Sequence, residues 1–286
     1  MRQTKINAPK ALVTCFCQNP RRARVICCAV LALLVPGALS APAPRPADIP
    51  ATAAGPQVKP PSPTYHFPAG QTYVYHVDWG LTTAGMAMLK MENKGEEHRI
   101  EVTGYSTGVV NILYTVRDHM ESVFDSRTFC SSLYSKHTEE AYRKRDEQVR
   151  FDYARRKAVK DAKNLRNNES QHVETDIPPC VTDVISGFYY VSSLPLEVND
   201  TYRFPLSDGA PTVEVQAHVE GKEQVKTKAG TFPAIRVVAD ALSGSLKGRG
   251  RLWIWYSDDA ARIPVQMRAK LKWGSLSFTL QRIDRQ

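Results

Sequence analysis

From about residue 71 onward, apolar and polar side chains alternate with a period of two. The stretch Gln71–Trp79 is the clearest case, because Tyr73, Tyr75, Val77 and Trp79 fall on one face and most intervening residues are polar. Successive side chains of a strand point to opposite faces, so this pattern is typical of strands with one buried and one solvated face. The chain is therefore predicted to be mainly β.

About a dozen such runs are separated by turn signals, which include Lys94-Gly95, Asp208-Gly209 and Ala229-Gly230. Many short strands predict a large curved antiparallel sheet or a closed, barrel-like domain, and both remain open. The expected strands are Gln71–Trp79, Ala84–Met91, His98–Tyr105, Asp118–Phe124, Ser131–His137, Gln148–Tyr153, Thr201–Leu206, Thr212–Val219, Phe232–Ala239, Gly250–Tyr256, Pro264–Leu271 and Leu276–Ile283.

Two segments have a helical pattern. Val181–Val191 follows two prolines, begins with Thr182 or Asp183 as a possible N-cap, and carries apolar residues on one face at helical spacing. Gly108–Thr115 is a shorter candidate. A helix lying across the mouth or the concave side of a curved sheet would bury both partners.

The N-terminal region has the layout of an export signal. Arg21, Arg22 and Arg24 precede the apolar run Val25–Val35, and small residues follow. The run has 11 residues, whereas a membrane-spanning helix needs roughly 20. We expect a signal peptide at 1–41, with an uncleaved anchor as the alternative, and no transmembrane segment in the mature chain. The expected location is the periplasm or cell envelope.

A proline-rich stretch follows the expected signal peptide. Nine prolines lie between Pro36 and Pro63, and proline lacks an N–H and fixes φ, so this stretch cannot join a sheet or continue a helix. We expect a disordered tether at 42–66 and one antiparallel β domain at 67–286.

The net charge of +9 is concentrated near the N-terminus. Residues 1–64 hold eight Lys and Arg and one acid, which leaves 30 Lys and Arg against 28 Asp and Glu for the rest. A nucleic-acid binder needs a clustered basic face, so no nucleic-acid partner is predicted. The basic stretch Arg143–Lys160 contains interleaved acids and alternating apolar residues, which favours a solvated hairpin.

Of six cysteines, four lie in the leader, and the mature chain keeps Cys130 and Cys180. In an oxidising compartment two cysteines most simply form one disulfide, which would close a loop of about 50 residues and stabilise by roughly 4 kcal/mol. Two buried thiols or a reactive cysteine are the alternatives.

No sequence motif predicts catalysis, a metal site or a cofactor. The seven histidines lack zinc-type spacing, and no nucleophile elbow, phosphate-binding loop or dinucleotide fingerprint is present. Numerous aromatic residues either fill a core or line an apolar cavity. For the second interpretation the candidate ligand-binding residues are Trp79, Tyr189, Tyr190 and Trp255.

Three motifs together resemble an exported bacterial family, the domain-of-unknown-function family 3108. They are Tyr75–Ala87 (YHVDWGLTTAGMA), Thr182–Tyr190 (TDVISGFYY) and Trp255–Val265 (WYSDDAARIPV), with the closing Lys272–Leu276 (KWGSL). The resemblance spans roughly residues 68–284 and departs at Gly187, where alanine is expected. It implies an envelope protein of mostly β structure and no known activity.

Three hypotheses for function follow from these features. The favoured one is a non-catalytic envelope protein that binds a lipid or another apolar or amphiphilic ligand in a curved β-sheet. One alternative is an assembly or structural protein that binds another envelope protein. The other is a hydrolase with a scattered Ser/His/Asp site, for which no catalytic residue can be named.

Overall fold

The computed structural model describes residues 56–243, 250–271 and 274–285, so the expected signal peptide and residues 42–55 of the expected tether lie outside the described residues. Within them, fourteen strands form one antiparallel sheet. The strands are β1 (Gln71–Trp79), β2 (Thr82–Asn93), β3 (Glu97–Ser106), β4 (Val116–Asp125), β5 (Ser131–Glu140), β6 (Arg143–Asp152), β7 (Lys157–Asn164), β8 (Ser170–Asp176), β9 (Thr201–Leu206), β10 (Val213–Thr227), β11 (Gly230–Ala241), β12 (Arg251–Ser257), β13 (Pro264–Leu271) and β14 (Gly274–Arg285).

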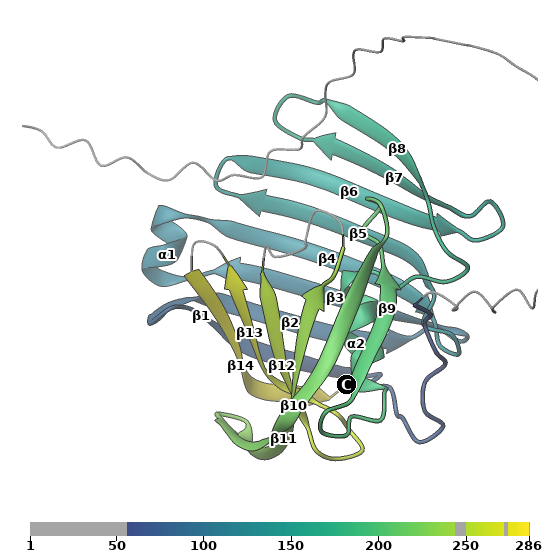
Figure 1. Ribbon diagram of the computed structural model, residues 1–286. Helices are drawn as coiled ribbons and strands as arrows, with labels where there is room; N and C mark the ends of the chain where they lie inside the picture. The colour runs from purple at the N-terminus through teal and green to yellow at the C-terminus, as the bar shows by residue number, and fades with distance from the viewer. Residues whose placement is uncertain (1–55, 244–249, 272–273, 286) are drawn as a thin grey trace, which may run out of the picture. The chain divides into compact units, whose positions relative to one another are not determined.

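The sheet follows chain order except at one junction. Its strand order is β8-β7-β6-β5-β4-β3-β2-β1-β14-β13-β12-β11-β10-β9, so the first strand pairs with the last. In the described residues the sheet does not close, because its outermost strands β8 and β9 do not pair with each other. Figure 1 shows the sheet curling around the helix α2. The prediction of a mainly β fold is confirmed, and of the two forms left open the structure has the curved, open sheet.

The sequence pattern missed or shortened some strands at the sheet's margin. β8 was not predicted, because most of its residues are polar and exposed, so it lacks an alternating apolar face. β10 continues to Thr227, beyond the predicted end at Val219, through a bulge between Val219 and Gly221. The hairpin predicted for Arg143–Lys160 is confirmed as β6 and β7.

Both predicted helices are present. α1 (Gly108–Leu113) connects β3 to β4 and has no buried residue. α2 (Val184–Ser192) connects β8 to β9, and most of its residues are buried. No helix in the part of the chain that the structure describes has the length and apolar character needed to span a bilayer.

Asp183 caps α2 from inside the core, with none of its surface exposed. One carboxylate oxygen, Oδ1, accepts hydrogen bonds from the backbone N–H groups of Ile185 (2.7 Å) and Ser186 (3.0 Å). The other, Oδ2, accepts from the hydroxyls of Ser122 on β4 (2.6 Å) and Ser131 on β5 (2.7 Å). Burial raises the pKa of the carboxyl, and these hydrogen bonds act against that rise. This network fixes the start of the helix to the sheet.

A disulfide stabilises the same junction. Cys130, just before β5, is bonded to Cys180, just before α2, with an S–S distance of 2.08 Å. The residues that follow the two cysteines are also joined, because the backbone N–H of Ser131 donates a hydrogen bond to the carbonyl of Val181 (2.9 Å). The disulfide expected from the cysteine count is therefore present, and it lies beside the start of α2.

α2 and the inner face of the sheet share an aromatic core. The Tyr256 hydroxyl on β12 donates a hydrogen bond to the Phe188 carbonyl of α2 (2.7 Å). The Tyr190 ring lies 4.9 Å from that of Phe204 and 5.6 Å from that of Phe129, between centroids. Aromatic pairs at such spacings stabilise beyond their buried area. The helix thus covers the inner face of the sheet at the end of the domain where α2 lies, away from α1.

The packed part of the chain begins before the expected boundary at residue 67. The Lys59 backbone N–H donates to the Tyr190 hydroxyl (3.2 Å), and the hydroxyls of Tyr65 and Ser192 are 2.8 Å apart. Val58 and Tyr65 pack against the core. The expectation that the tether is disordered as far as residue 66 therefore does not hold for residues 56–66, because Lys59 and Tyr65 are hydrogen-bonded to α2 and Val58 packs against the core.

Candidate functional site

Four inward-facing residues of β1 show that the inner face of the sheet is filled at one end and open at the other. Tyr73 and Tyr75 are 1% and 0% exposed, Val77 is partly buried, and Trp79 is 45% exposed. Alternate residues of a strand point to the same face, so these four form one column. Solvent reaches the inner face at the end near α1, away from α2.

The strands on both sides of the sheet show the same partly exposed side chains at this end of the inner face. Val77 lies opposite Phe278 of β14, and Met120 of β4 lies opposite Val102 of β3. These four residues and Leu252 of β12 are partly buried and pack against the fully buried core. We call these five residues the apolar floor. Its exposed part is a surface on which a further apolar group could be buried.

A band of charged side chains borders the apolar floor. Lys136 of β5 lies opposite both Met120 and Glu147, so all three side chains share the inner face. Glu147 is already bonded to Lys160 (2.7 Å) and Arg145 (2.7 Å). Lys136 forms no ion pair with any described residue. A partly buried cation is thus placed beside the apolar floor.

Asp118 lies on the same face, two residues along β4 from Met120. Burial is the main cause that raises the pKa of its carboxyl to about 6, and the negative charge of Glu140 adds to the rise. The positive charge of Lys136 and a backbone hydrogen bond from Glu139 (3.3 Å) act in the opposite direction. The Asp118 carboxyl, with its pKa near 6, therefore titrates in a mildly acidic range.

This pKa predicts how stability depends on pH. The carboxyl has a higher pKa folded than unfolded, so its protonation stabilises the native state below about pH 4, and this contribution is lost as pH rises through about 6. An Asp118→Asn variant is expected to be up to about 1 kcal/mol more stable than the wild type at pH 7, after allowance for partial solvation. Urea unfolding between pH 4 and 7 should show this difference vanishing toward pH 4; a difference independent of pH would contradict the assignment.

The structure separates the four residues predicted to bind a ligand. Trp79 lies at the open end of the inner face, where its indole lies over Gly274; a Cβ built there would be 2.6 Å from the indole nitrogen. Tyr189 and Tyr190 belong to α2 and are 2% exposed, inside the filled end. Trp255 alternates with the inward-facing Tyr256, so it lies on the outer face. Their role in binding stays a prediction.

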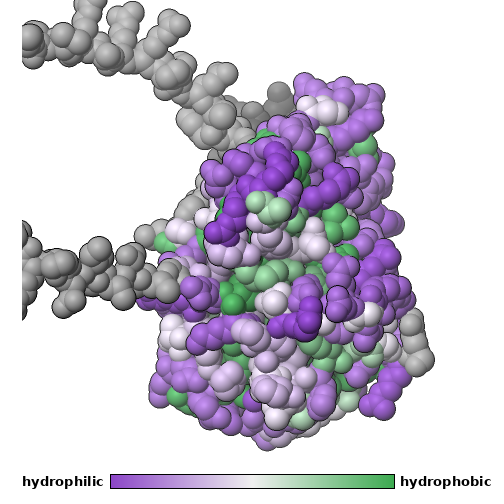
Figure 2. Space-filling model, turned by 90° about the vertical axis from the view of Figure 1, so that its right-hand side faces the viewer, coloured by the Kyte–Doolittle hydropathy of each residue, from purple (hydrophilic) through white to green (hydrophobic). Residues whose placement is uncertain are grey.

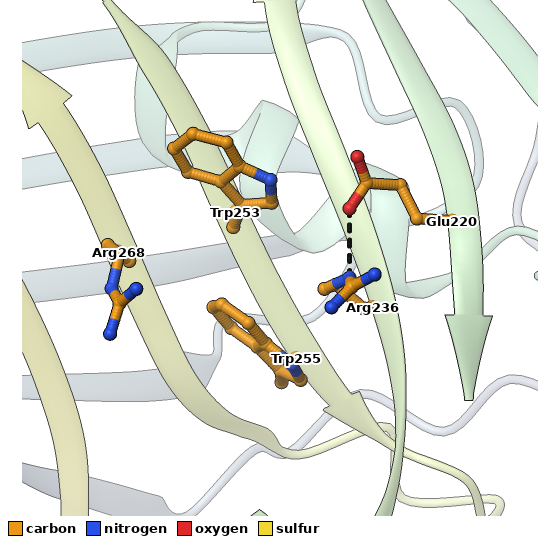
Figure 3. Close-up of a pocket in the computed structure, with 5 residues that line it drawn as sticks. All are labelled: Glu220, Arg236, Trp253, Trp255 and Arg268. Carbon is orange, nitrogen blue, oxygen red and sulfur yellow. Dashed lines mark ion pairs between the residues drawn. The ribbon is translucent and has the colours of Figure 1, made fainter. Parts of the chain in front are cut away.

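The outer face carries a hollow of about 300 Å³ beside Trp255. Figure 3 shows Trp253 and Trp255 projecting from β12 between Arg268 and the ion pair of Glu220 with Arg236 (2.8 Å). The indole N–H of Trp255 also donates to Glu223 (2.7 Å). Cationic side chains and indole rings on neighbouring strands can pack against one another. We therefore interpret these side chains as a layer that covers the outer face of the sheet.

Only some features of the inner face could be predicted from the sequence. The run Tyr73 to Trp79 placed Val77 on the same face as Trp79, and this signal could have identified it. Alternation likewise assigns Met120 and Lys136 to a face of their strands. It does not say which end of that face remains open, because that depends on where α2 packs.

The described residues offer little for catalysis or metal binding. No histidine among them is hydrogen-bonded to a serine, and the closest hydroxyl partner, Thr201 with His218 (2.9 Å), lies on the exposed surface. Nor is any group of three or more His, Cys, Asp or Glu side chains in this part of the chain placed to hold a metal ion.

Comparison with known proteins gives one family and several related folds. The family described as "Protein of unknown function (DUF3108)" matches residues 74–281. No curated protein matches the chain. Among solved structures, the chain is similar to a beta-barrel-like protein of domain of unknown function DUF1849 from Brucella abortus, with a TM-score of 0.57 and 8% identity over 80% of this chain and 99% of that one.

Two further structures are similar at a lower level. One is a protein with YmcC-like fold from Bacteroides fragilis, with a TM-score of 0.35 and 9% identity over 77% of this chain and 98% of that one. The other is the hypothetical protein CT021 from Chlamydia trachomatis, with a TM-score of 0.35 and 7% identity over 76% and 88%. At 8% identity the likeness to the Brucella protein concerns the fold alone.

Proposed function

The chain belongs to the DUF3108 family of proteins of unknown function, and we propose that it binds an amphiphile, a molecule with an acyl chain and an anionic head group, on the inner face of its sheet. One observation carries this proposal: the inward-facing column of β1 changes from fully buried at Tyr75 to 45% exposed at Trp79. An apolar surface that is continuous with the core and open at one end suits a molecule that is apolar along most of its length.

The apolar floor provides the contacts for the acyl chain. Val77, Phe278 and Met120 each retain exposed apolar surface, and covering such surface contributes about 25 cal/mol per Å². Their backs rest on buried residues, so the surface is already formed and a ligand would not have to order it.

The charged band supports the choice of an anionic head group. Lys136 shares its face with Met120 and has no ion-pair partner among the described residues, whereas the neighbouring Glu147 is bonded to two cations. A carboxylate or phosphate beside Lys136 would gain a charge-assisted hydrogen bond.

We also propose that this binding takes place outside the cytoplasm, in the periplasm or cell envelope, and that it involves no catalysis. The support for the location is the sequence of the leader, with Arg21, Arg22 and Arg24 before the short apolar run Val25–Val35. On this proposal residues 1–41 are a signal peptide and residues 42–55 a proline-rich spacer.

A test of the acyl-chain contact compares two adjacent residues on opposite faces. A dansyl-labelled fatty acid should bind the purified protein with fluorescence enhancement and be displaced by unlabelled palmitate. Val77→Gln is expected to weaken this binding about tenfold, because it removes about 1.5 kcal/mol of apolar contact. His76→Gln, on the outer face, is the matched control and should bind as the wild type does. No binding of the probe, or equal losses in the two variants, would refute the proposal.

The head group can be tested with the same probe. Lys136→Gln should weaken binding of the anionic fatty acid several-fold while leaving an uncharged monoacylglycerol unaffected. Lys163→Gln, an exposed cation of β7 without an acidic partner in the described residues, is the control. Equal effects on the charged and uncharged ligands would show that Lys136 does not contact the head group.

A further inference from the structure

Exposed apolar side chains gather at the end of the domain that carries α1. Of the ten large hydrophobic residues exposed in the described part of the chain, eight belong to the strand ends, turns and helix at this end, and two, Val184 and Val198, lie elsewhere. We call six of the eight the apolar rim: Leu81, Val109, Ile112, Leu113, Tyr114 and Tyr142.

Backbone hydrogen bonds bring these segments side by side. Thr107, at the start of α1, donates to the carbonyl of Ala84 (3.0 Å), which places α1 beside the β1–β2 turn. Ala141, in the β5–β6 turn, donates to the carbonyl of Thr115 (2.8 Å), just after α1. Figure 1 shows α1 at the margin of the sheet, on the side away from α2 and β9. The segments that carry the apolar rim are therefore neighbours at this end of the sheet.

The helix in this rim turns its apolar residues toward solvent. Val109, Ile112 and Leu113 are 65%, 82% and 78% exposed, and α1 contains neither a charged nor a buried residue. A surface helix normally buries its apolar side. A contiguous exposed apolar patch marks an interaction site. By contrast, Figure 2, which views the side of the domain opposite α1, shows mainly hydrophilic side chains with separate hydrophobic patches between them.

Cations flank the apolar rim. Arg117 donates to the Asn111 side chain of α1 (3.3 Å), and Arg166 donates to the Tyr142 carbonyl (2.7 Å). Arg143 follows Tyr142 directly, and none of these three arginines forms an ion pair with a described residue. Glu139 at this end is neutralised by Lys144 (3.0 Å). Glu140 lies opposite Arg143 and adds one negative charge. Beside the rim, the three arginines without an ion pair among the described residues therefore outnumber this one carboxylate.

We infer that the apolar rim docks on an anionic lipid bilayer. Projecting aliphatic and tyrosine side chains insert at the boundary between head groups and acyl chains. Adjacent arginines pair with anionic head groups, and the binding free energy is the sum of the apolar and the electrostatic contributions. A second copy of this chain is a poorer occupant, because a symmetric contact would bring Arg117, Arg143 and Arg166 toward their own equivalents. The inference goes beyond the proposed amphiphile binding and does not require it.

The test is cosedimentation of the purified protein with vesicles of phosphatidylcholine alone and of a roughly two-to-one mixture with phosphatidylglycerol. The protein should bind the mixed vesicles, and binding should fall sharply near 1 M salt, where the Debye length is about 3 Å. The double variant Ile112→Ser/Leu113→Ser should lose at least about tenfold in affinity. Both residues are highly exposed, so folding should be preserved, as circular dichroism can verify. The matched control, Val184→Ser/Val198→Ser, should bind as the wild type does.

A second pair of variants tests the charges. Arg143→Gln/Arg166→Gln should weaken binding to the mixed vesicles, whereas Lys226→Gln/Lys228→Gln, two exposed lysines near the β10–β11 turn, should not. Absence of vesicle binding, or equal losses in the rim and control variants, would overturn the inference. So would sedimentation showing a dimer that the Ile112→Ser/Leu113→Ser substitutions dissociate, because the rim would then be an interface between copies. Fatty-acid binding is measured without vesicles, so either proposal can fail alone.

Discussion

Replacing Asp183 with alanine is expected to lower the free energy of unfolding by about 3–4 kcal/mol. The carboxylate is fully buried and accepts four hydrogen bonds, two from the start of α2 and two from serines of β4 and β5. Alanine would leave the N–H groups of Ile185 and Ser186 and the Ser122 hydroxyl without this acceptor in the core, whereas the Ser131 hydroxyl keeps the Ser186 hydroxyl (2.8 Å) as a partner. Because α2 fills the inner side of the sheet, we also expect the loss to loosen the aromatic core around Tyr190. Urea unfolding followed by tryptophan fluorescence measures the effect.

Asp183→Asn is the control for this prediction. Its side-chain oxygen can still accept hydrogen bonds from the N–H groups of Ile185 and Ser186, so a smaller loss of about 1–2 kcal/mol is expected. Asparagine cannot accept from both serine hydroxyls, since its amide nitrogen is a donor. If the alanine variant lost no more than the asparagine variant, the hydrogen bonds from the N–H groups of Ile185 and Ser186, which asparagine keeps, would contribute little to stability.

Removing the disulfide should have a similarly large effect. The Cys130→Ala/Cys180→Ala variant is expected to lose about 4 kcal/mol, because the bond closes a loop with a sequence separation of 50 residues and so restricts the unfolded chain. The bond also joins the chain before β5 to the chain before α2, close to the Asp183 network. The midpoint of urea unfolding should shift accordingly.

Reduction provides the control for the disulfide. Dithiothreitol should shift the unfolding midpoint of the wild type toward that of the double alanine variant and leave the variant itself unchanged. A reductant effect of equal size on both proteins would mean that the stabilisation does not arise from this bond. The Cys130→Ala/Cys180→Ala and Asp183→Ala changes should also be less than additive when combined, because both loosen the same junction.

Several elements were predictable because their signals are local. Alternation identified most strands, and the run Val181–Val191 contained the whole of α2 apart from its last residue. Asp183 was one of two predicted caps, and Cys130 and Cys180 are the two cysteines of the sequence that follow residue 41. Family membership also followed from short motifs, since the match covers residues 74–281.

Other elements carried no local signal. β8 has few apolar residues because it is an exposed edge strand, so its pairing with β7 alone defines it. The order of the segment before β1 depends on partners distant in sequence, such as Tyr190 for Lys59 and Ser192 for Tyr65. For the same reason the aromatic residues singled out from composition divided among three environments. Trp79 lies at the open end, Tyr189 and Tyr190 lie in the core, and Trp255 is buried on the outer face of the sheet.

The sequence by itself determined which side chains share a face, because in a strand that depends only on the alternating direction of successive residues. Only the tertiary structure decided which face is concave, where α2 packs and which end of the inner surface stays exposed. Those outcomes depend on strand pairing and helix packing between residues far apart in the chain, such as Tyr75 with Leu280 or Ser131 with Asp183. No local sequence pattern predicts such contacts. The candidate binding surface could therefore be identified only from the tertiary structure, in which the sheet curves around α2.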